Sequence, residues 1–237
     1  VYCVINITSG EEVIVSERLL YQSTYRMPEK PSVEKEGYIF SGWTDGNVTY
    51  NPSATVTVSS NLELSALWTM KTFKINFELK TGSNPVPSEK KYWEPFVFEF
   101  VPSRDGYRFM GWSLSENSEE IAYKTGDEYT KNENIVLYAV WKELSYIVSY
   151  SIPEAENSIP AQIKMHTEKL QLSDTIPVRS GYTFTGWSTK QEAVLPEYKP
   201  GELFNINADT VLYAVWKNGI VAGDADTVQL VAAEDFN

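Results

Sequence analysis

The chain has 237 residues, of which 42% are hydrophobic and 22% charged, so it can form one large folded domain or several small ones. Its formal net charge of −12 argues against nucleic acid or an anionic membrane as a partner. A single Cys and a single His exclude an intrachain disulfide and most metal and triad chemistry. No apolar run approaches the roughly 18 residues that a membrane-spanning helix needs, so we expect no direct membrane insertion.

One motif occurs three times along the chain. It reads GYIFSGW at 37–43, GYRFMGW at 106–112 and GYTFTGW at 181–187. Each copy is followed by an alternating segment that ends in Trp, at Trp68, Trp141 and Trp216. Self-similarity at such a period indicates tandem modules, which we place at 1–70, 71–142 and 143–217. Residues 218–237 are then an acidic linker or the start of a further domain.

Alternation of period two dominates each module and predicts β-strands. The last segments carry Leu, Ala and Trp on one face, which we expect to be the core side. The opposite face is polar in the first module and apolar in the other two, so we expect it to be partly covered there. Asn61, Asn134 and Asp209 precede these segments, where an Asx side chain can close a turn.

The repeated motif breaks the alternation at one place. Its Tyr and Phe share a parity, whereas the final Trp has the opposite one. A β-bulge at the intervening glycine would restore the parity, because an extra residue moves every later side chain to the other face. We therefore predict bulges at Gly42, Gly111 and Gly186. Both Trp positions of each module are predicted to be structural core, namely Trp43, Trp68, Trp112, Trp141, Trp187 and Trp216.

The complete pattern resembles a known family. Pro-x-Arg-x-Gly-Tyr-x-Phe-x-Gly-Trp, Tyr-x-x-Gly at 123–126 and 198–201, and Leu-Tyr-Ala-x-Trp are similar to the Listeria–Bacteroides repeat, the B-repeat of internalin-type surface proteins. The resemblance implies mainly β modules of β-grasp-like character on bacterial surface and secreted proteins. The first module departs from the pattern, because it lacks Pro-x-Arg and carries Leu-Ser-Ala-Leu-Trp.

No candidate for catalysis stands out. His166 lies in a strand-like stretch without the nucleophile or orienting carboxylate that a catalytic base needs. Cys3 is expected to be a small buried side chain. Paired carboxylates such as Glu119 and Glu120 fall in expected loops, in modules too small to build a glycosidase cleft readily. We therefore expect no enzyme activity, no cofactor and no metal site.

One aromatic cluster is not explained by the repeat. Trp93 has no counterpart in the other modules, and Tyr92 and Phe96 lie beside it. These three residues are a possible binding surface, with packing inside the module as the alternative.

The sequence thus predicts a monomeric, non-catalytic segment of a bacterial cell-surface or secreted protein. Three modules joined by four-residue linkers, at 69–72 and 142–145, would form an extended rod that acts as a stalk or spacer or in adhesion. The alternative function is a carbohydrate- or host-protein-binding region that uses exposed aromatic residues of the second and third modules. The partner would be a host or cell-surface protein or a glycan.

Overall fold

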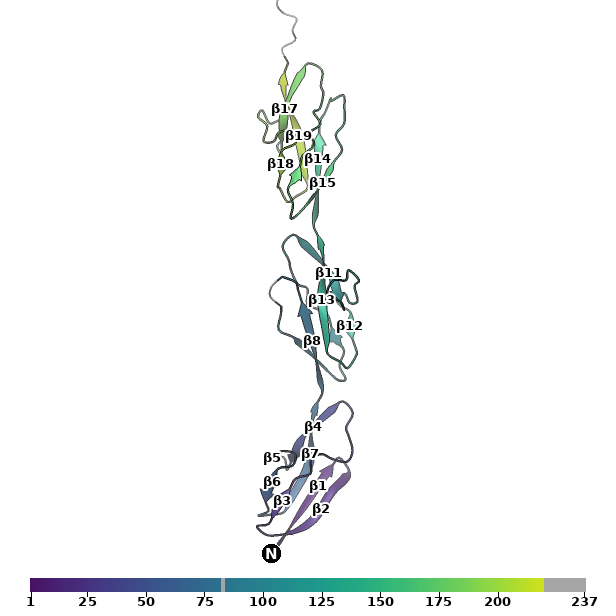
Figure 1. Ribbon diagram of the computed structural model, residues 1–237, viewed down its shortest axis with the longest axis vertical. Coiled ribbons are helices and arrows are strands. Elements are labelled where there is room, and N and C mark those ends of the chain that lie inside the picture. Colours follow the sequence, from purple (N-terminus) through teal and green to yellow (C-terminus); the bar gives the residue numbers. More distant parts are fainter. Residues whose placement is uncertain (82–83, 220–237) are drawn as a thin grey trace, which may run out of the picture. The chain divides into compact units, whose positions relative to one another are not determined.

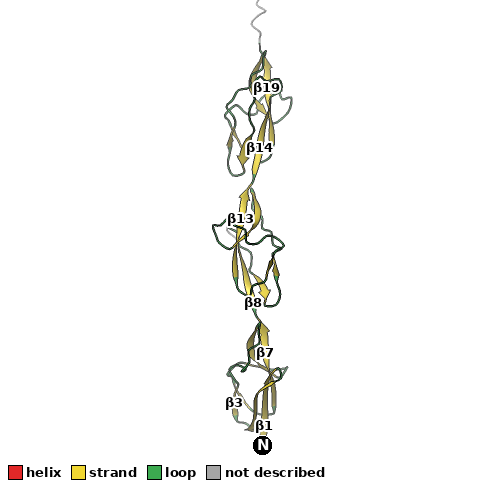
Figure 2. Ribbon diagram, turned by 90° about the vertical axis from the view of Figure 1, so that its right-hand side faces the viewer, coloured by secondary structure: helices red, strands yellow, loops and turns green. Residues whose placement is uncertain are grey.

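A computed structural model describes residues 1–81 and 84–219. All regular elements of this part are strands, and it contains no helix (Figure 2). The chain divides into two compact units, Val1–Pro102 with Met110–Val140, and Ser103–Phe109 with the described residues from Trp141 onward. The predicted linker or further domain at 218–237 lies outside the described residues, apart from Asn218 and Gly219. Among the described residues, no helix is long and apolar enough to cross a membrane.

The first repeat forms a five-stranded sheet with the order β2-β1-β7-β4-β5 and a separate two-stranded ribbon of β3 and β6 (Figure 1). β1 and β7 are parallel neighbours in the middle of the sheet, and the other pairs are antiparallel. The strands are β1 (Tyr2–Ser9), β2 (Glu12–Leu20), β3 (Thr24–Arg26), β4 (Tyr38–Thr44), β5 (Thr49–Tyr50), β6 (Thr55–Thr57) and β7 (Leu62–Met70).

The second repeat has the same arrangement with one strand fewer. Its sheet has the order β11-β13-β8-β9, and β10 pairs with β12 in a ribbon. β8 and β13, the first and last strands, are again parallel neighbours. The strands are β8 (Thr72–Glu78), β9 (Ser88–Lys91), β10 (Phe96–Val97), β11 (Tyr107–Ser113), β12 (Glu128–Tyr129) and β13 (Ile135–Glu143).

The third repeat follows this plan as well. Its sheet has the order β15-β14-β19-β17, with β14 and β19 parallel, and β16 pairs with β18 in a ribbon. The strands are β14 (Ser145–Ser151), β15 (Gln162–Met165), β16 (Leu170–Gln171), β17 (Tyr182–Ser188), β18 (Leu203–Phe204) and β19 (Thr210–Asn218). The prediction of a mainly β chain with three repeats is therefore confirmed for the described residues.

The Asx side chain before each last strand extends across the sheet. The Oδ1 atoms of Asn61, Asn134 and Asp209 accept hydrogen bonds from backbone N–H groups of the first strand, at 2.9, 2.8 and 2.8 Å. We had expected these side chains to close a local turn. Instead they satisfy first-strand N–H groups that lie just before the parallel ladder begins.

The predicted bulge is present in β4 and β17. The register of β4 against β7 shifts between Phe40 and Gly42, and that of β17 against β19 shifts between Phe184 and Gly186. The glycine φ angles are +147° and +145°, a region that residues with a Cβ rarely adopt. A Cβ on Gly186 would also lie 2.5 Å from the carbonyl oxygen of Tyr198, so both backbone conformation and space require glycine here.

The tryptophan that follows each bulge is the centre of its core. Trp43, Trp112 and Trp187 are fully buried. They pack with the alternating side chains of the first and last strands, such as Ile5 and Leu64 in the first repeat.

The second tryptophan of each repeat differs from our expectation, because Trp68, Trp141 and Trp216 are only partly buried. Each ring makes an edge contact, with centroids 5.6 Å apart, with the phenylalanine of the GYxFxGW motif. This cross-strand contact covers one part of each tryptophan ring, and the rest of the ring is accessible to solvent.

Candidate functional site

The segment between two repeats is shorter than predicted. β7 ends at Met70 and β8 begins at Thr72, so Lys71 alone separates the strands. Its N–H donates to the carbonyl oxygen of Gly37 at 2.8 Å, and its own carbonyl accepts from the N–H of Tyr92 at 3.0 Å. Both backbone polar groups of Lys71 are therefore hydrogen-bonded, the N–H to the first repeat and the carbonyl to the second.

The same bonds recur within the second compact unit. Leu144 stands alone between β13 and β14. Its N–H donates to the carbonyl oxygen of Gly106 at 2.8 Å, and its carbonyl accepts from the N–H of His166 at 2.9 Å. The first glycine of the motif, which the sequence analysis did not assign a role, is thus the acceptor at both places.

Side chains close over these two glycines. A Cβ on Gly37 would lie 2.8 Å from Tyr92 Cδ1, and one on Gly106 would lie 2.1 Å from His166 Cδ2. The preceding acidic residues interact with the same rings. The Tyr92 hydroxyl donates to Glu36 at 3.1 Å, and His166 Nε2 lies 3.5 Å from Asp105. The hydrogen bond to Glu36 raises the pKa of the Tyr92 hydroxyl, with smaller contributions from burial and the Glu36 charge.

Two buried lysines support this arrangement, and the sequence analysis missed both. Lys90 and Lys164 are each 2% exposed and precede Tyr92 and His166 by two residues. The Lys90 ammonium donates to the Lys91 carbonyl at 3.1 Å and to Asn132 Oδ1 at 2.8 Å. Lys164 makes the corresponding bonds to Met165 and Asn207. Alternation could have suggested their burial, because each faces inward from its strand.

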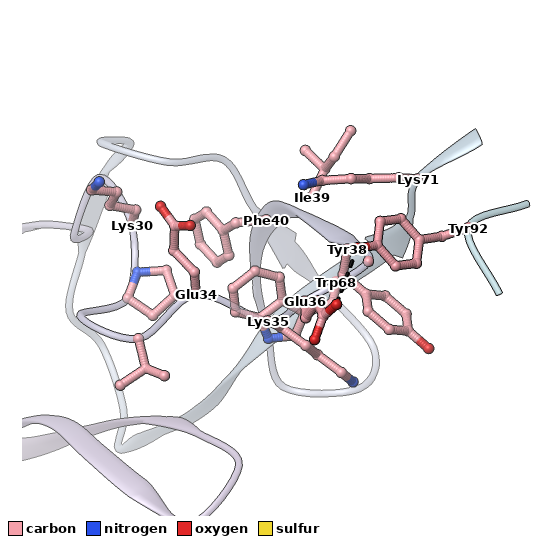
Figure 3. Close-up of a pocket in the computed structure, with 13 residues that line it drawn as sticks. Lys30, Glu34, Lys35, Glu36, Tyr38, Ile39, Phe40, Trp68, Lys71 and Tyr92 are labelled. Atoms are coloured by element: carbon pink, nitrogen blue, oxygen red, sulfur yellow. Dashed lines mark hydrogen bonds between the residues drawn. The ribbon is translucent and has the colours of Figure 1, made fainter. Parts of the chain in front are cut away.

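A pocket of about 470 Å³ opens beside Gly37 in the first unit. Figure 3 shows Lys30 and Glu34 on one side and Lys71 and Tyr92 on the other. The lining combines aromatic rings with charges of both signs. It consists of Lys30, Pro31, Val33, Glu34, Lys35, Glu36, Gly37, Tyr38, Ile39, Phe40, Trp68, Lys71 and Tyr92.

The residue two before the motif glycine differs among the repeats. Arg104 and Arg179 lie over the rings of Tyr107 and Tyr182, at 3.7 and 3.9 Å from the centroids. Arg179 is also 5.9 Å from the Trp216 ring and forms an ion pair with Glu154. The first repeat has Lys35 here, whose ammonium lies 4.2 Å from the Tyr38 centroid.

The structure separates the predicted aromatic cluster. Tyr92 reaches the pocket, whereas Trp93 is 58% exposed and makes an edge contact with Tyr92 at 4.7 Å. Phe96 packs instead with Phe98, with ring centroids 5.3 Å apart. A binding role for the exposed Trp93 stays a prediction.

The candidates that we set aside for catalysis are placed as follows. His166 is partly buried, and its Nδ1 is 2.9 Å from the Tyr146 hydroxyl. Cys3 is a buried free thiol in β1. No group of three or more His, Cys, Asp or Glu side chains gathers for a metal ion in the part of the chain that the structure describes.

Comparison with known families accounts for the repeats. The model of the Listeria-Bacteroides repeat domain matches residues 2–67, 73–140 and 146–215. The chain belongs to this family. The resemblance drawn from GYxFxGW and the terminal Trp is therefore confirmed, and all three repeats, including the divergent first one, are members. The Listeria-Bacteroides repeat is a non-enzymatic repeat domain.

Two relatives come from Evansella cellulosilytica. One, named "Putative membrane protein", is 28% identical over 223 residues, which are 91% of this chain and 33% of the relative. The other, named "Putative Gly-rich membrane protein", is 28% identical over 213 residues, 86% of this chain and 23% of the relative. The Listeria-Bacteroides repeats of this chain thus span about a third or less of each relative.

Proposed function

We propose that this chain is a non-catalytic spacer in a bacterial cell-surface or secreted protein. Its three β-grasp-like repeats follow one another as an extended rod. Membership of a non-enzymatic repeat family supports the first part, and the names of the two longer relatives support a membrane-associated setting. The parallel first and last strands of every repeat support the β-grasp-like description.

The observation that carries the proposal is the single connecting residue with bonds on both sides. Lys71 donates to Gly37 and accepts from Tyr92, and Leu144 does the same between Gly106 and His166. A residue held by two backbone bonds has little of the freedom of a flexible linker. Repeats connected in this way can hold a fixed spacing, which is what a spacer requires.

Small-angle scattering of the 237-residue chain tests the rod. Three domains in a line give a radius of gyration of about 27 Å, whereas one compact body of this length gives about 18 Å. A value near 18 Å would refute the rod. A variant with Gly-Ser-Gly-Ser inserted after Lys71 and after Leu144 serves as a comparison. The insertion moves the two backbone hydrogen bonds of each connecting position onto different residues, and it should broaden the pair-distance distribution from scattering. An unchanged distribution would show that the connecting residues do not restrict the repeats.

A surface location is tested separately in the native bacterium. Antibodies raised against the three repeats should label intact cells or the culture medium. Labelling only after the cells are opened would refute the cell-surface or secreted location without affecting the rod.

A further inference from the structure

The pocket beside Gly37 carries three ammonium groups with no ion-pair partner among the described residues. Lys30, Lys35 and Lys71 all line it, and no carboxylate lies within 4.0 Å of their Nζ atoms in residues 1–81 and 84–219. Two carboxylates, Glu34 and Glu36, also face the pocket. The lining therefore has a formal charge of +1 on a chain whose total is −12. This balance matches a ligand with one negative charge better than a polyanion.

Aromatic rings form the apolar part of the same pocket. Tyr38, Phe40 and Trp68 line it and are partly buried, so each ring presents some surface to an occupant. The Phe40 and Trp68 rings meet edge to face at 5.6 Å. The volume of about 470 Å³ lies within the range of small-molecule sites. A ligand here can gain from apolar contact and from charge together.

The other repeats show how this ring surface can be covered. In the third repeat, the guanidinium of Arg179 lies over Tyr182, near Trp216, and is held by Glu154. The first repeat has a shorter lysine at this position, and its Trp68 lines a pocket instead. The departure of the first repeat from Pro-x-Arg thus coincides with the cavity.

We propose that this pocket binds one acidic sugar residue, a pyranose that bears a single carboxylate. The C–H face of the sugar packs on Trp68 and Phe40, since aromatic rings provide large apolar contact areas. The carboxylate pairs with the Lys71 ammonium group, on the Tyr92 side of the pocket. Sugar hydroxyls donate to the carboxylates of Glu34 and Glu36, whereas these carboxylates would repel the additional carboxylates of an acidic peptide. This inference goes beyond the spacer function and does not depend on it.

The test is to titrate the 237-residue protein with candidate ligands and to monitor the NMR signal of the Trp68 indole N–H. The probes are methyl galacturonide and methyl galactoside, which differ in the carboxylate, and a tetrapeptide of aspartate. We expect the uronide to shift the Trp68 signal in a saturable way and the galactoside to bind about tenfold more weakly. The proposal is overturned if the uronide causes no shift, if both sugars act equally, or if the peptide binds more tightly.

Lys71→Leu separates binding from folding. Leu144 occupies the equivalent position in the second repeat, so the backbone bonds of residue 71 do not need a lysine. We expect this variant to melt like the wild type and to bind the uronide about tenfold more weakly. Lys217→Leu, the same change at an exposed lysine of the third repeat, should bind as the wild type does. Equal affinity of Lys71→Leu and Lys217→Leu would overturn the proposal.

Discussion

The first and third repeats share the core strand arrangement and the bulge, and they differ in the hydrogen bond of the buried indole and in the residue two positions before the motif glycine. The ring centroids of the motif Phe and the buried Trp are 4.8 Å apart in the first repeat and 4.7 Å apart in the third. The same bulge lies between the two residues in both repeats. The indole N–H does differ, since Trp43 donates to the Pro28 carbonyl at 2.9 Å. Trp187 Nε1 is buried and has no acceptor among the described residues.

This comparison shows which parts of the repeat can vary independently. The bulge and its tryptophan are constrained by backbone geometry and core volume, so both repeats keep them. The residue two positions before the motif glycine and the hydrogen bond of the indole N–H differ between the two repeats without altering the sheet.

The shared core gives the largest expected effect. Trp43→Ala and Trp187→Ala each remove a fully buried ring and should lower the free energy of unfolding by about 3–5 kcal/mol. Hydrogen exchange should show lost protection in the strands of the repeat that carries the change. A wild-type exchange pattern in either variant would contradict the common core.

The bulge glycine should have the next largest effect. Gly186→Val combines an unfavourable φ with a Cβ 2.5 Å from a carbonyl oxygen, and should cost about 2–4 kcal/mol. Gly201→Ala is the control, because its φ is +73° and its Cβ would have only an ordinary contact at 3.9 Å. That change should cost about 1–2 kcal/mol. Equal midpoints of the two variants in denaturant would remove the steric argument.

The indole bond distinguishes the two repeats more finely. Trp43→Phe loses a hydrogen bond and leaves the Pro28 carbonyl without its donor, whereas Trp187→Phe removes a donor without a described acceptor. Trp43→Phe should therefore be the more destabilising by about 1 kcal/mol. Urea unfolding of both variants measures the difference, and a larger loss for Trp187→Phe would reverse the interpretation.

The second repeat extends the comparison to high pH. Burial raises the pKa of Tyr129 to about 12, while the third repeat has Phe204 at the equivalent ribbon position. Because the folded pKa is raised, the stabilisation is complete below the ordinary value near 10 and is lost as the pH rises toward 12. Tyr129→Phe should cost about 1 kcal/mol at neutral pH, because the hydroxyl donates to the Glu133 carbonyl at 3.2 Å, and it should reduce the alkaline loss. Denaturant midpoints between pH 9 and 12 test it, and an identical alkaline loss in the variant would contradict it.

Local patterns were enough to predict the strands, the three repeats and the bulges at Gly42 and Gly186. The parity of Trp43 against Phe40 is a property of a few neighbouring residues, and it determined both the bulge and the inward tryptophan. The role of Gly37 was missed because its contact, Tyr92, is 55 positions away and belongs to another repeat. Alternation places Lys90 on the inward face of its strand, but a lysine is rarely buried, and the acceptor that satisfies it, Asn132, is 42 positions away. The pocket was missed because it combines residues 30–40 with Trp68, Lys71 and Tyr92, which are distant in the sequence.

The parallel pairing of the first and last strands also determines how a repeat resists mechanical load. β14 begins the third repeat and β19 ends it, and the two lie side by side in the same direction. A force that pulls the two ends apart therefore slides these strands along each other. The ladder from Val148–Thr210 to Ser151–Tyr213 is then loaded in shear, so its hydrogen bonds share the force and do not open one after another. The same geometry places the parallel ladders of β1–β7 and β8–β13 in shear when the chain is pulled from its ends.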